Sequence, residues 1–234
     1  MADNPHEGHR KRLKNELLQL DFPEEAPDHK ILEMLLFYGI PRRDTNPIAH
    51  ALLDKFGSLA GVFEADPQDL FEVEGMTQNS VCLIKIILPI VRKSYLQKYE
   101  EGYKFSNIDE YGEQLVKRFF GHNKEMFIIS CFDNKGALIS TKTVAKGDTD
   151  NVSVSVKTIV KIVLHCNPTT VIVAHNHVDS PAVPSKADIE MTQNLKFILQ
   201  QINIRLLDHI IVSGNDYVSM RQSGDFTHLF DYTL

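Results

Sequence analysis

Residues 171–192 read VIVAHNHVDSPAVPSKADIEMT and combine the end of a strand with the start of a helix. The run TTVIVAH (169–175) is apolar up to its histidine, as expected of a central strand buried on both faces. Side chains two apart on a strand point to the same face, so His175 and His177 can share one metal ion. The pattern Ser-x-x-Asp at Ser185 and Asp188 then predicts the start of a helix.

A loop over residues 178–184 can fold this helix start back over the strand end, where Asp188 would supply a third ligand. Two imidazoles and one carboxylate, with a fourth position left to water, are the ligands of a catalytic zinc site, and Zn²⁺ suits this N/N/O set. Each part has a structural alternative: Ser185 and Asp188 form an ordinary capping pattern, and most isolated His-x-His pairs bind no metal. The joint spacing favours the metal site.

The rest of the second half alternates between helical and extended patterns, which indicates an α/β domain. The turn residues Asp133-Asn134-Lys135-Gly136 predict a hairpin between two β-rich runs. Residues 154–165 are rich in Val and Ile, but the spacing of their apolar positions favours a helix. The expected helices are 107–120, 154–165 and 185–201, and the expected strands are 125–132, 137–145, 169–175, 204–213 and 217–220.

The first half reads as helical throughout. Apolar residues recur at helical spacing in 29–38, and Asn46-Pro47 and Asp66-Pro67 are typical helix starts. A longer helix follows Thr77, with a kink expected at Pro89. The polar segment YEEGYKFSN (99–107) separates the two patterns. We therefore predict a small all-α domain over 1–100 and an α/β domain over 101–234.

The composition excludes a disordered or fibrous protein. Of the 234 residues, 43% are hydrophobic and 24% are charged, which is ordinary for a globular chain. No apolar run could span a membrane, and the polar N-terminus lacks the apolar core of a secretory signal. Without a signal peptide, Cys82, Cys131 and Cys166 are expected to be reduced thiols in a cytoplasmic protein.

The net charge of −6 gives no support for nucleic-acid binding. The local exception is the basic run HRKR (9–12), followed by Lys14. Its two interpretations are a solvated helix start, which we favour, and a patch that contacts phosphate.

The spacing His-x-His, seven residues, Ser, two residues, Asp resembles the JAMM motif of MPN (JAB) metalloproteases. The wider sequence resembles the bacterial RadC family, the so-called DNA repair proteins. This resemblance covers nearly the whole chain. It rests on GHRKRL (8–13), LLFYGIPRRDTNPIAHALL (35–53), FGSLAGVFEA (56–65), AHNH (174–177), PSKADI (184–189) and LLDHIIVS (206–213).

The resemblance implies an MPN/JAB domain, with a mixed central sheet flanked by helices, in which His175, His177 and Asp188 hold Zn²⁺. It also implies a glutamate at the start of the first strand, the position of Glu125 in KEMFIISCF. A carboxylate there could accept the proton of a zinc-bound water and pass it to the leaving amine. Ser185 would stabilise the developing oxyanion through its hydroxyl.

The sequence departs from the family pattern at three places. RadC-like sequences usually read HNHPSG, whereas residues 175–180 read HNHVDS, which predicts an altered loop between the ligands. The usual Arg-Glu of the preceding helix aligns with Lys157-Thr158, so a second candidate glutamate is missing. Residues 147–155 (GDTDNVSVS) also differ. We expect these changes to affect efficiency and substrate range.

Residues 71–85 resemble a helix-hairpin-helix, a motif that binds the DNA backbone through amides exposed by Gly-h-Gly. Here Gly75 takes the first glycine position, but Thr77 takes the second and Val81 replaces a small residue. Glu72 and Glu74 add negative charge. These features favour a turn that packs helices over one that binds phosphate.

The leading hypothesis is a zinc-dependent MPN-fold hydrolase of the RadC type, a metallopeptidase acting on an amide or isopeptide bond of a peptide or protein. The alternative is a DNA-associated repair or recombination accessory protein with an idle or structural metal site. A third hypothesis is a scaffold domain that binds a protein partner and catalyses nothing. No membrane partner is expected, and the sequence leaves the oligomeric state open.

Overall fold

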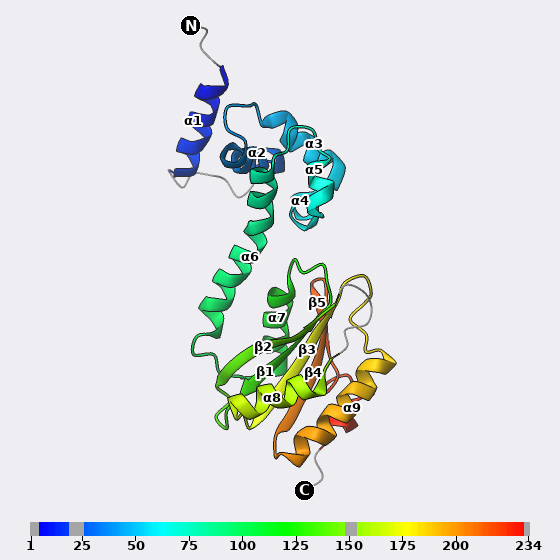
Figure 1. Ribbon diagram of the computed structural model, residues 1–234. Helices are drawn as coiled ribbons and strands as arrows, with labels where there is room; N and C mark the ends of the chain where they lie inside the picture. The colour runs from blue at the N-terminus through cyan, green and yellow to red at the C-terminus, as the bar shows by residue number, and fades with distance from the viewer. Residues whose placement is uncertain (1–4, 19–25, 148–153, 232–234) are drawn as a thin grey trace. The chain divides into compact units, whose positions relative to one another are not determined.

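The computed structural model describes residues 5–18, 26–147 and 154–231 (Figure 1). The chain divides into two compact units, Met1–Val91 and Arg92–Leu234. The helix α6 (Gln78–Glu100) runs from the first unit into the second, so the limits of the two predicted domains, 1–100 and 101–234, stay a prediction. Among the described residues, no helix is both long and apolar enough to cross a membrane.

The first unit is built from helices, as the sequence predicts. Its core contains Leu32, Leu36 and Leu52, all fully buried. The helix start indicated by Asn46-Pro47 is that of α3, where Thr45 occupies the N-cap position and Asn46 is already helical. The helices are α1 (Pro5–Leu18), α2 (Asp28–Gly39), α3 (Asn46–Phe56), α4 (Leu59–Glu64), α5 (Pro67–Phe71) and the first part of α6.

The turn before α6 packs helices together. Gly75 has φ +92°, and a Cβ atom there would lie 2.7 Å from the side chain of Ile48, so this position favours glycine. Thr77 donates from its hydroxyl to the carbonyl of Gly39 at the end of α2, at 3.1 Å. These contacts fix α6 against α2 and α3, which agrees with the packing interpretation of this turn.

The basic run at the start of the chain lies on α1, and part of it is used inside the unit. His9 Nε2 lies 3.1 Å from the buried carboxylate of Glu33. Arg10 donates to the carbonyl of Ile40 at 3.0 Å, and its guanidinium lies over the ring of Phe37. These contacts give His9 and Arg10 a structural role in joining α1 to α2.

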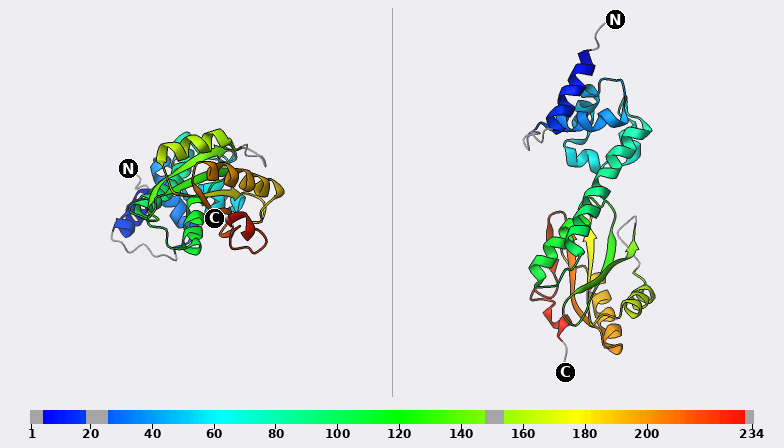
Figure 2. Two further views of the ribbon diagram at one scale, coloured as in Figure 1. Left: turned by 90° about the horizontal axis from the view of Figure 1, so that it is seen from below. Right: turned by 90° about the vertical axis from the view of Figure 1, so that its left-hand side faces the viewer.

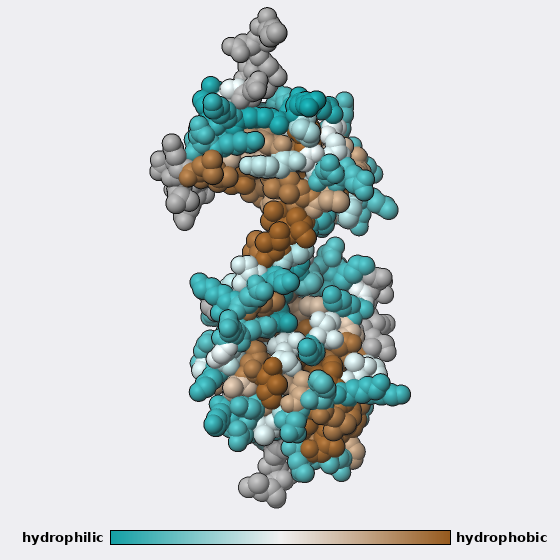
Figure 3. All heavy atoms as spheres, turned by 60° about the vertical axis from the view of Figure 1, so that its left-hand side comes forward, coloured by the Kyte–Doolittle hydropathy of each residue, from teal (hydrophilic) through white to brown (hydrophobic). Residues whose placement is uncertain are grey.

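The middle of α6 exposes apolar side chains. Ile86, Ile90 and Val91 are each about half exposed (47%, 55% and 53%), and this part of the helix is brown in Figure 3.

The second unit contains one five-stranded sheet in the order β2-β1-β3-β4-β5. β3 and β4 pair in parallel, and the other pairs are antiparallel. Asp133 Oδ1 closes the predicted β1–β2 turn by accepting from the amides of Lys135 and Ala137, each at 2.8 Å. The elements are α7 (Ile108–Phe119), β1 (Met126–Phe132), β2 (Leu138–Lys146), α8 (Val156–Cys166), β3 (Thr170–His177), α9 (Lys186–Gln201), β4 (Arg205–Ser213), β5 (Asp216–Ser219) and the 3-10 helix η1 (Thr227–Phe230).

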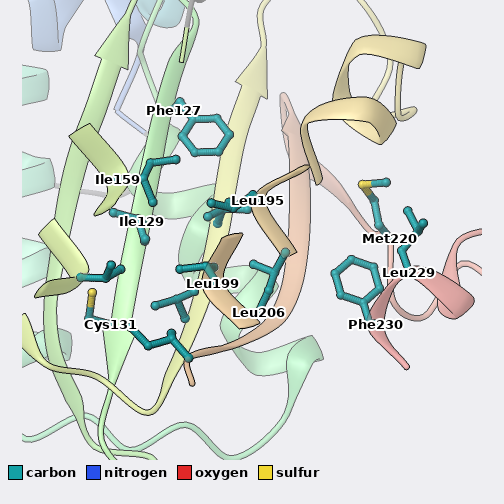
Figure 4. Close-up of a cluster of buried hydrophobic side chains, with 14 of the residues drawn as sticks. Phe127, Ile129, Cys131, Ile159, Leu195, Leu199, Leu206, Met220, Leu229 and Phe230 are labelled. Carbon is teal, nitrogen blue, oxygen red and sulfur yellow. The ribbon is translucent and has the colours of Figure 1, made fainter. Parts of the chain in front are cut away.

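Helices cover both faces of this sheet, so the mixed α/β class is confirmed. Ile159 of α8 and Leu195 of α9 pack on one face, against alternate β1 residues such as Phe127 and Ile129 (Figures 2 and 4). α7 packs on the other face, where Leu115 joins the remaining β1 positions. β3 lies in the middle of the sheet and is buried along nearly all its length, as predicted for residues 169–175.

Candidate metal centre

The centre lies where β3 ends and α9 begins. The β3 strand continues to His177, and His175, close to the end of the strand, is only 7% exposed. The chain returns through residues 178–185 and enters α9, whose first turn holds Asp188. The sequence predicted this return, and the structure brings His175, His177 and Asp188 together.

Asp188 is held by a capping box. Its Oδ2 accepts from the amide of Ser185 at 2.8 Å and from the Ser185 hydroxyl at 2.6 Å. The amide of Asp188 in turn donates to the Ser185 hydroxyl at 3.2 Å. Because Oδ2 carries both contacts from Ser185, Oδ1 is the oxygen that faces His175 Nε2, at 3.2 Å. The capping and ligand interpretations of Asp188 are therefore compatible in one side chain.

The two predicted imidazoles converge on the same point. His175 Nε2 and His177 Nε2 are 3.0 Å apart, and His177 Nε2 is 3.8 Å from Asp188 Oδ2. His177 Nδ1 lies 2.9 Å from the carbonyl of Pro181. A carbonyl can only accept, so this contact assigns the hydrogen of a neutral His177 to Nδ1 and leaves a lone pair on Nε2. Metal-binding histidines commonly donate a hydrogen bond from their second ring nitrogen to a carbonyl in this way.

Burial favours the uncharged form of His175 and His209. Desolvation, opposed by the nearby Asp188 carboxylate, lowers the pKa of His175 to about 4. Desolvation also holds the pKa of the fully buried His209 well below its ordinary value. Neutral imidazole is the form that binds a metal, so at neutral pH no proton has to be removed from a charged His175 ring.

The structure adds one residue that the sequence patterns did not single out. His209 on β4 places Nε2 at 2.9 Å from His175 Nδ1, and ligand atoms of His175, Asp188 and His209 all lie within 4.8 Å of one another. These three residues form a candidate metal group in their own right. Since the two nitrogens of an imidazole point in different directions, His209 lies on the side of His175 opposite the contact with His177.

Glu125 directly precedes β1 and lies beside this strand end. The antiparallel register of β1 and β3 ends with Phe127 opposite His175, and Glu125 lies two residues before Phe127 at this end of the sheet. Asn176 holds the backbone on both sides of Glu125: its Oδ1 accepts from the amide of Met126 at 2.8 Å, and its Nδ2 donates to the carbonyl of Lys124 at 3.1 Å. Glu125 thus directly precedes the first strand of the sheet, and its role in proton transfer stays a prediction.

The position aligned with a second family glutamate lies in the first turn of α8. Thr158 occupies it, and its amide donates to the hydroxyl of the capping residue Ser155. The divergent segment 147–155 lies mostly outside the described residues, which omit 148–153.

Comparison with known proteins agrees with this geometry. Residues 105–225 match the model of a family described as the RadC-like JAB domain. The chain is also 33% identical over 231 residues to the UPF0758 protein FN0909 of Fusobacterium nucleatum, which covers 96% of this chain and 99% of that protein. The helical first unit is therefore part of the similarity. On these grounds the chain belongs to the RadC family, and its second unit carries a RadC-like JAB domain with a candidate metal centre.

Proposed function

We propose that this protein is a zinc-dependent hydrolase that cleaves an amide or isopeptide bond in a peptide or protein. The observation that carries the proposal is the convergence of His175 Nε2, His177 Nε2 and Asp188 Oδ1 at the end of β3. His175 Nε2 lies 3.0 Å from His177 Nε2 and 3.2 Å from Asp188 Oδ1, and His177 Nε2 lies 3.8 Å from Asp188 Oδ2. These separations suit ligands that each lie about 2.0–2.2 Å from one ion. We assign His177 rather than His209 as the third ligand, because His209 contacts the other nitrogen of His175.

The donors fit zinc in kind as well as in position. Two neutral imidazoles and one carboxylate are the ligands of several catalytic zinc sites, which leave a fourth position open. The remaining polar atoms of His177 and Asp188 are held by Pro181 and Ser185. A bound zinc ion supplies Lewis-acid chemistry, activating a water molecule and polarising a carbonyl.

The protein's own residues then have distinct tasks. Glu125, which directly precedes β1 at the end of the sheet that carries His175, accepts a proton from the attacking water and delivers it to the leaving amine. Ser185 orients Asp188, since its hydroxyl donates to Oδ2. The oxyanion role predicted for Ser185 requires this hydroxyl to turn away from Asp188, so we place its orienting role first.

Metal analysis tests the ligand assignment directly. We expect about one zinc ion per purified chain by plasma mass spectrometry, and little zinc in the double variant His175→Ala/His177→Ala. Glu125→Gln is the matched control, because a residue outside the ligand set should leave the zinc content unchanged. Equal zinc content in the wild type and the double variant would refute the assignment.

Activity is tested with a fluorogenic peptide library and a branched peptide that carries an ε-linked lysine. Glu125→Gln should lower kcat by about 10²–10⁴, the usual size of a general acid–base contribution. Cleavage that is undiminished in Glu125→Gln would remove Glu125 from this role. A zinc-loaded protein that cleaves neither kind of substrate would favour the accessory-protein alternative.

A further inference from the structure

We propose that Thr192 and His209 are positioning residues that set the tautomer of His175 and so keep its Nε2 free of hydrogen for a metal. The inference rests on the proposed metal site and adds residues to it. Both residues are fully buried, and they lie on two different elements, α9 and β4.

The backbone carbonyl of Asp188 fixes the direction of the hydrogen bond that it forms with Thr192. Thr192 Oγ1 lies 2.6 Å from the backbone carbonyl of Asp188, one turn earlier in α9. The carbonyl can only accept, so the Thr192 hydroxyl donates to it. Met220 Sδ lies 3.7 Å from Thr192 Oγ1, and sulfur at this distance is too weak an acceptor to compete for this hydrogen.

The remaining directions follow in order. Thr192 has a single hydroxyl hydrogen, which it donates to Asp188. Thr192 Oγ1 must therefore accept a hydrogen bond from His209 Nδ1, which lies 2.7 Å away. His209 therefore carries its hydrogen on Nδ1 and has a lone pair on Nε2. That lone pair, 2.9 Å from His175 Nδ1, accepts the hydrogen of His175. A neutral His175 is then left with a bare Nε2, the atom that faces His177 and Asp188.

This relay of hydrogen bonds connects two of the proposed ligands. It starts on the backbone of Asp188 and ends on the ring of His175, so one buried network fixes both the position of α9 and the orientation of the imidazole. Without the Thr192 hydroxyl, His209 Nδ1–H would lose its acceptor, and the other tautomer of His209 would become competitive. His175 would then accept at Nδ1 and carry hydrogen on Nε2, which must leave before a metal binds.

The test uses the full chain, stripped of metal, with zinc and cobalt as probes. Thr192→Val keeps the shape of the side chain but removes the hydroxyl, and Thr192→Ser keeps the hydroxyl. We expect Thr192→Val to weaken zinc binding about 10–100-fold in competition with a chromophoric chelator, the usual effect of losing a partner of a ligand. Thr192→Ser should bind zinc nearly as the wild type does. The visible spectrum of bound Co²⁺ should change in Thr192→Val and be retained in Thr192→Ser.

The outcomes separate the two proposals. A wild type that binds no zinc overturns the metal site and the relay with it. If the wild type and Thr192→Val bind zinc equally well and give the same Co²⁺ spectrum, the relay alone is overturned. If Thr192→Val does not fold, the tautomers can be read in the metal-free wild type from ¹⁵N chemical shifts of the imidazoles. Hydrogen on Nδ1 of both His175 and His209 supports the relay, and hydrogen on Nε2 of His175 overturns it.

Discussion

Replacing Asn176 with leucine should loosen the start of β1 next to the candidate centre. Asn176 is 4% exposed, and its amide holds the backbone of Lys124 and Met126 on either side of Glu125. Leucine has nearly the same shape but can neither accept nor donate a hydrogen bond. The change therefore removes both contacts without leaving a large cavity.

The expected cost comes mainly from Met126. Met126 is 5% exposed, so its amide would be left without a partner and shielded from water. An unsatisfied buried donor costs about 1–3 kcal/mol. The Asn176 contact with the carbonyl of Lys124 involves an exposed residue, so we expect the larger part of the cost at Met126. We expect Asn176→Leu to lower the free energy of unfolding by about 1–3 kcal/mol, which corresponds to about 5- to 150-fold in an opening equilibrium.

Hydrogen exchange at the Met126 amide measures this effect where it arises, and urea unfolding followed by circular dichroism measures the total. Asn194→Leu is the matched control, because Asn194 lies exposed on α9 and its replacement should leave stability within about 0.5 kcal/mol of the wild type. Unchanged protection of the Met126 amide in Asn176→Leu would refute the reasoning. Loss of stability without faster exchange at this amide would place the cost elsewhere.

Three further predictions concern metal, acid and thiols. Adding zinc to the metal-free protein should raise its thermal midpoint and the chelator EDTA should reverse this, since a ligand at 100 times its Kd stabilises the folded state by about 2.7 kcal/mol. Burial, together with Arg92, Lys146 and Arg118, lowers the pKa of His122 to about 4. Its neutral ring therefore contributes stability that is complete above the unfolded pKa of about 6.5 and is lost as pH falls towards 4. An NMR titration of the His122 ring that gives a midpoint near 6.5 would contradict this prediction. The exposed Cys82 should react with Ellman's reagent in the native protein. Cys131 is buried, and desolvation raises its pKa to about 12, so this thiol should react only after unfolding. Mass spectrometry of labelled peptides would show which thiol has reacted.

The part of the candidate centre formed by the end of β3 and the start of α9 could be predicted, because its residues are close together in the sequence. A continuous apolar run predicted β3, and Ser-x-x-Asp predicted the start of α9, so the return of Asp188 to His175 follows from a short loop. The helix α8 was predicted in spite of its Val and Ile content, and the structure explains why it forms. Ser155 caps its first turn, and Asn167 ends it in the left-handed conformation, with φ +48°.

The partners of the centre that come from distant parts of the chain could not be found in this way. His209 is 34 residues from His175 and lies within the apolar run IRLLDHIIVS (204–213), which reads simply as a strand. The available signal was the pair Asp208-His209, two polar residues in a run that should be buried. Buried polar groups are nearly always hydrogen-bonded, so this pair implied partners on neighbouring elements without naming them.

The face on which His209 lies depends on an irregularity that no alternating pattern reveals. In the parallel pairing of β3 with β4, Val171 lies opposite Leu206 and Ile172 lies opposite Asp208, so Leu207 is an extra residue in β4. Strict alternation from Leu206 would put His209 on the opposite face of the sheet, away from His175. The extra residue shifts the register by one, and a shift of one residue exchanges the two faces of the strand beyond it. The bulge thus turns His209 to the side of the sheet that carries His175 and Thr192, and the hydrogen bonds from Thr192 to His175 depend on it.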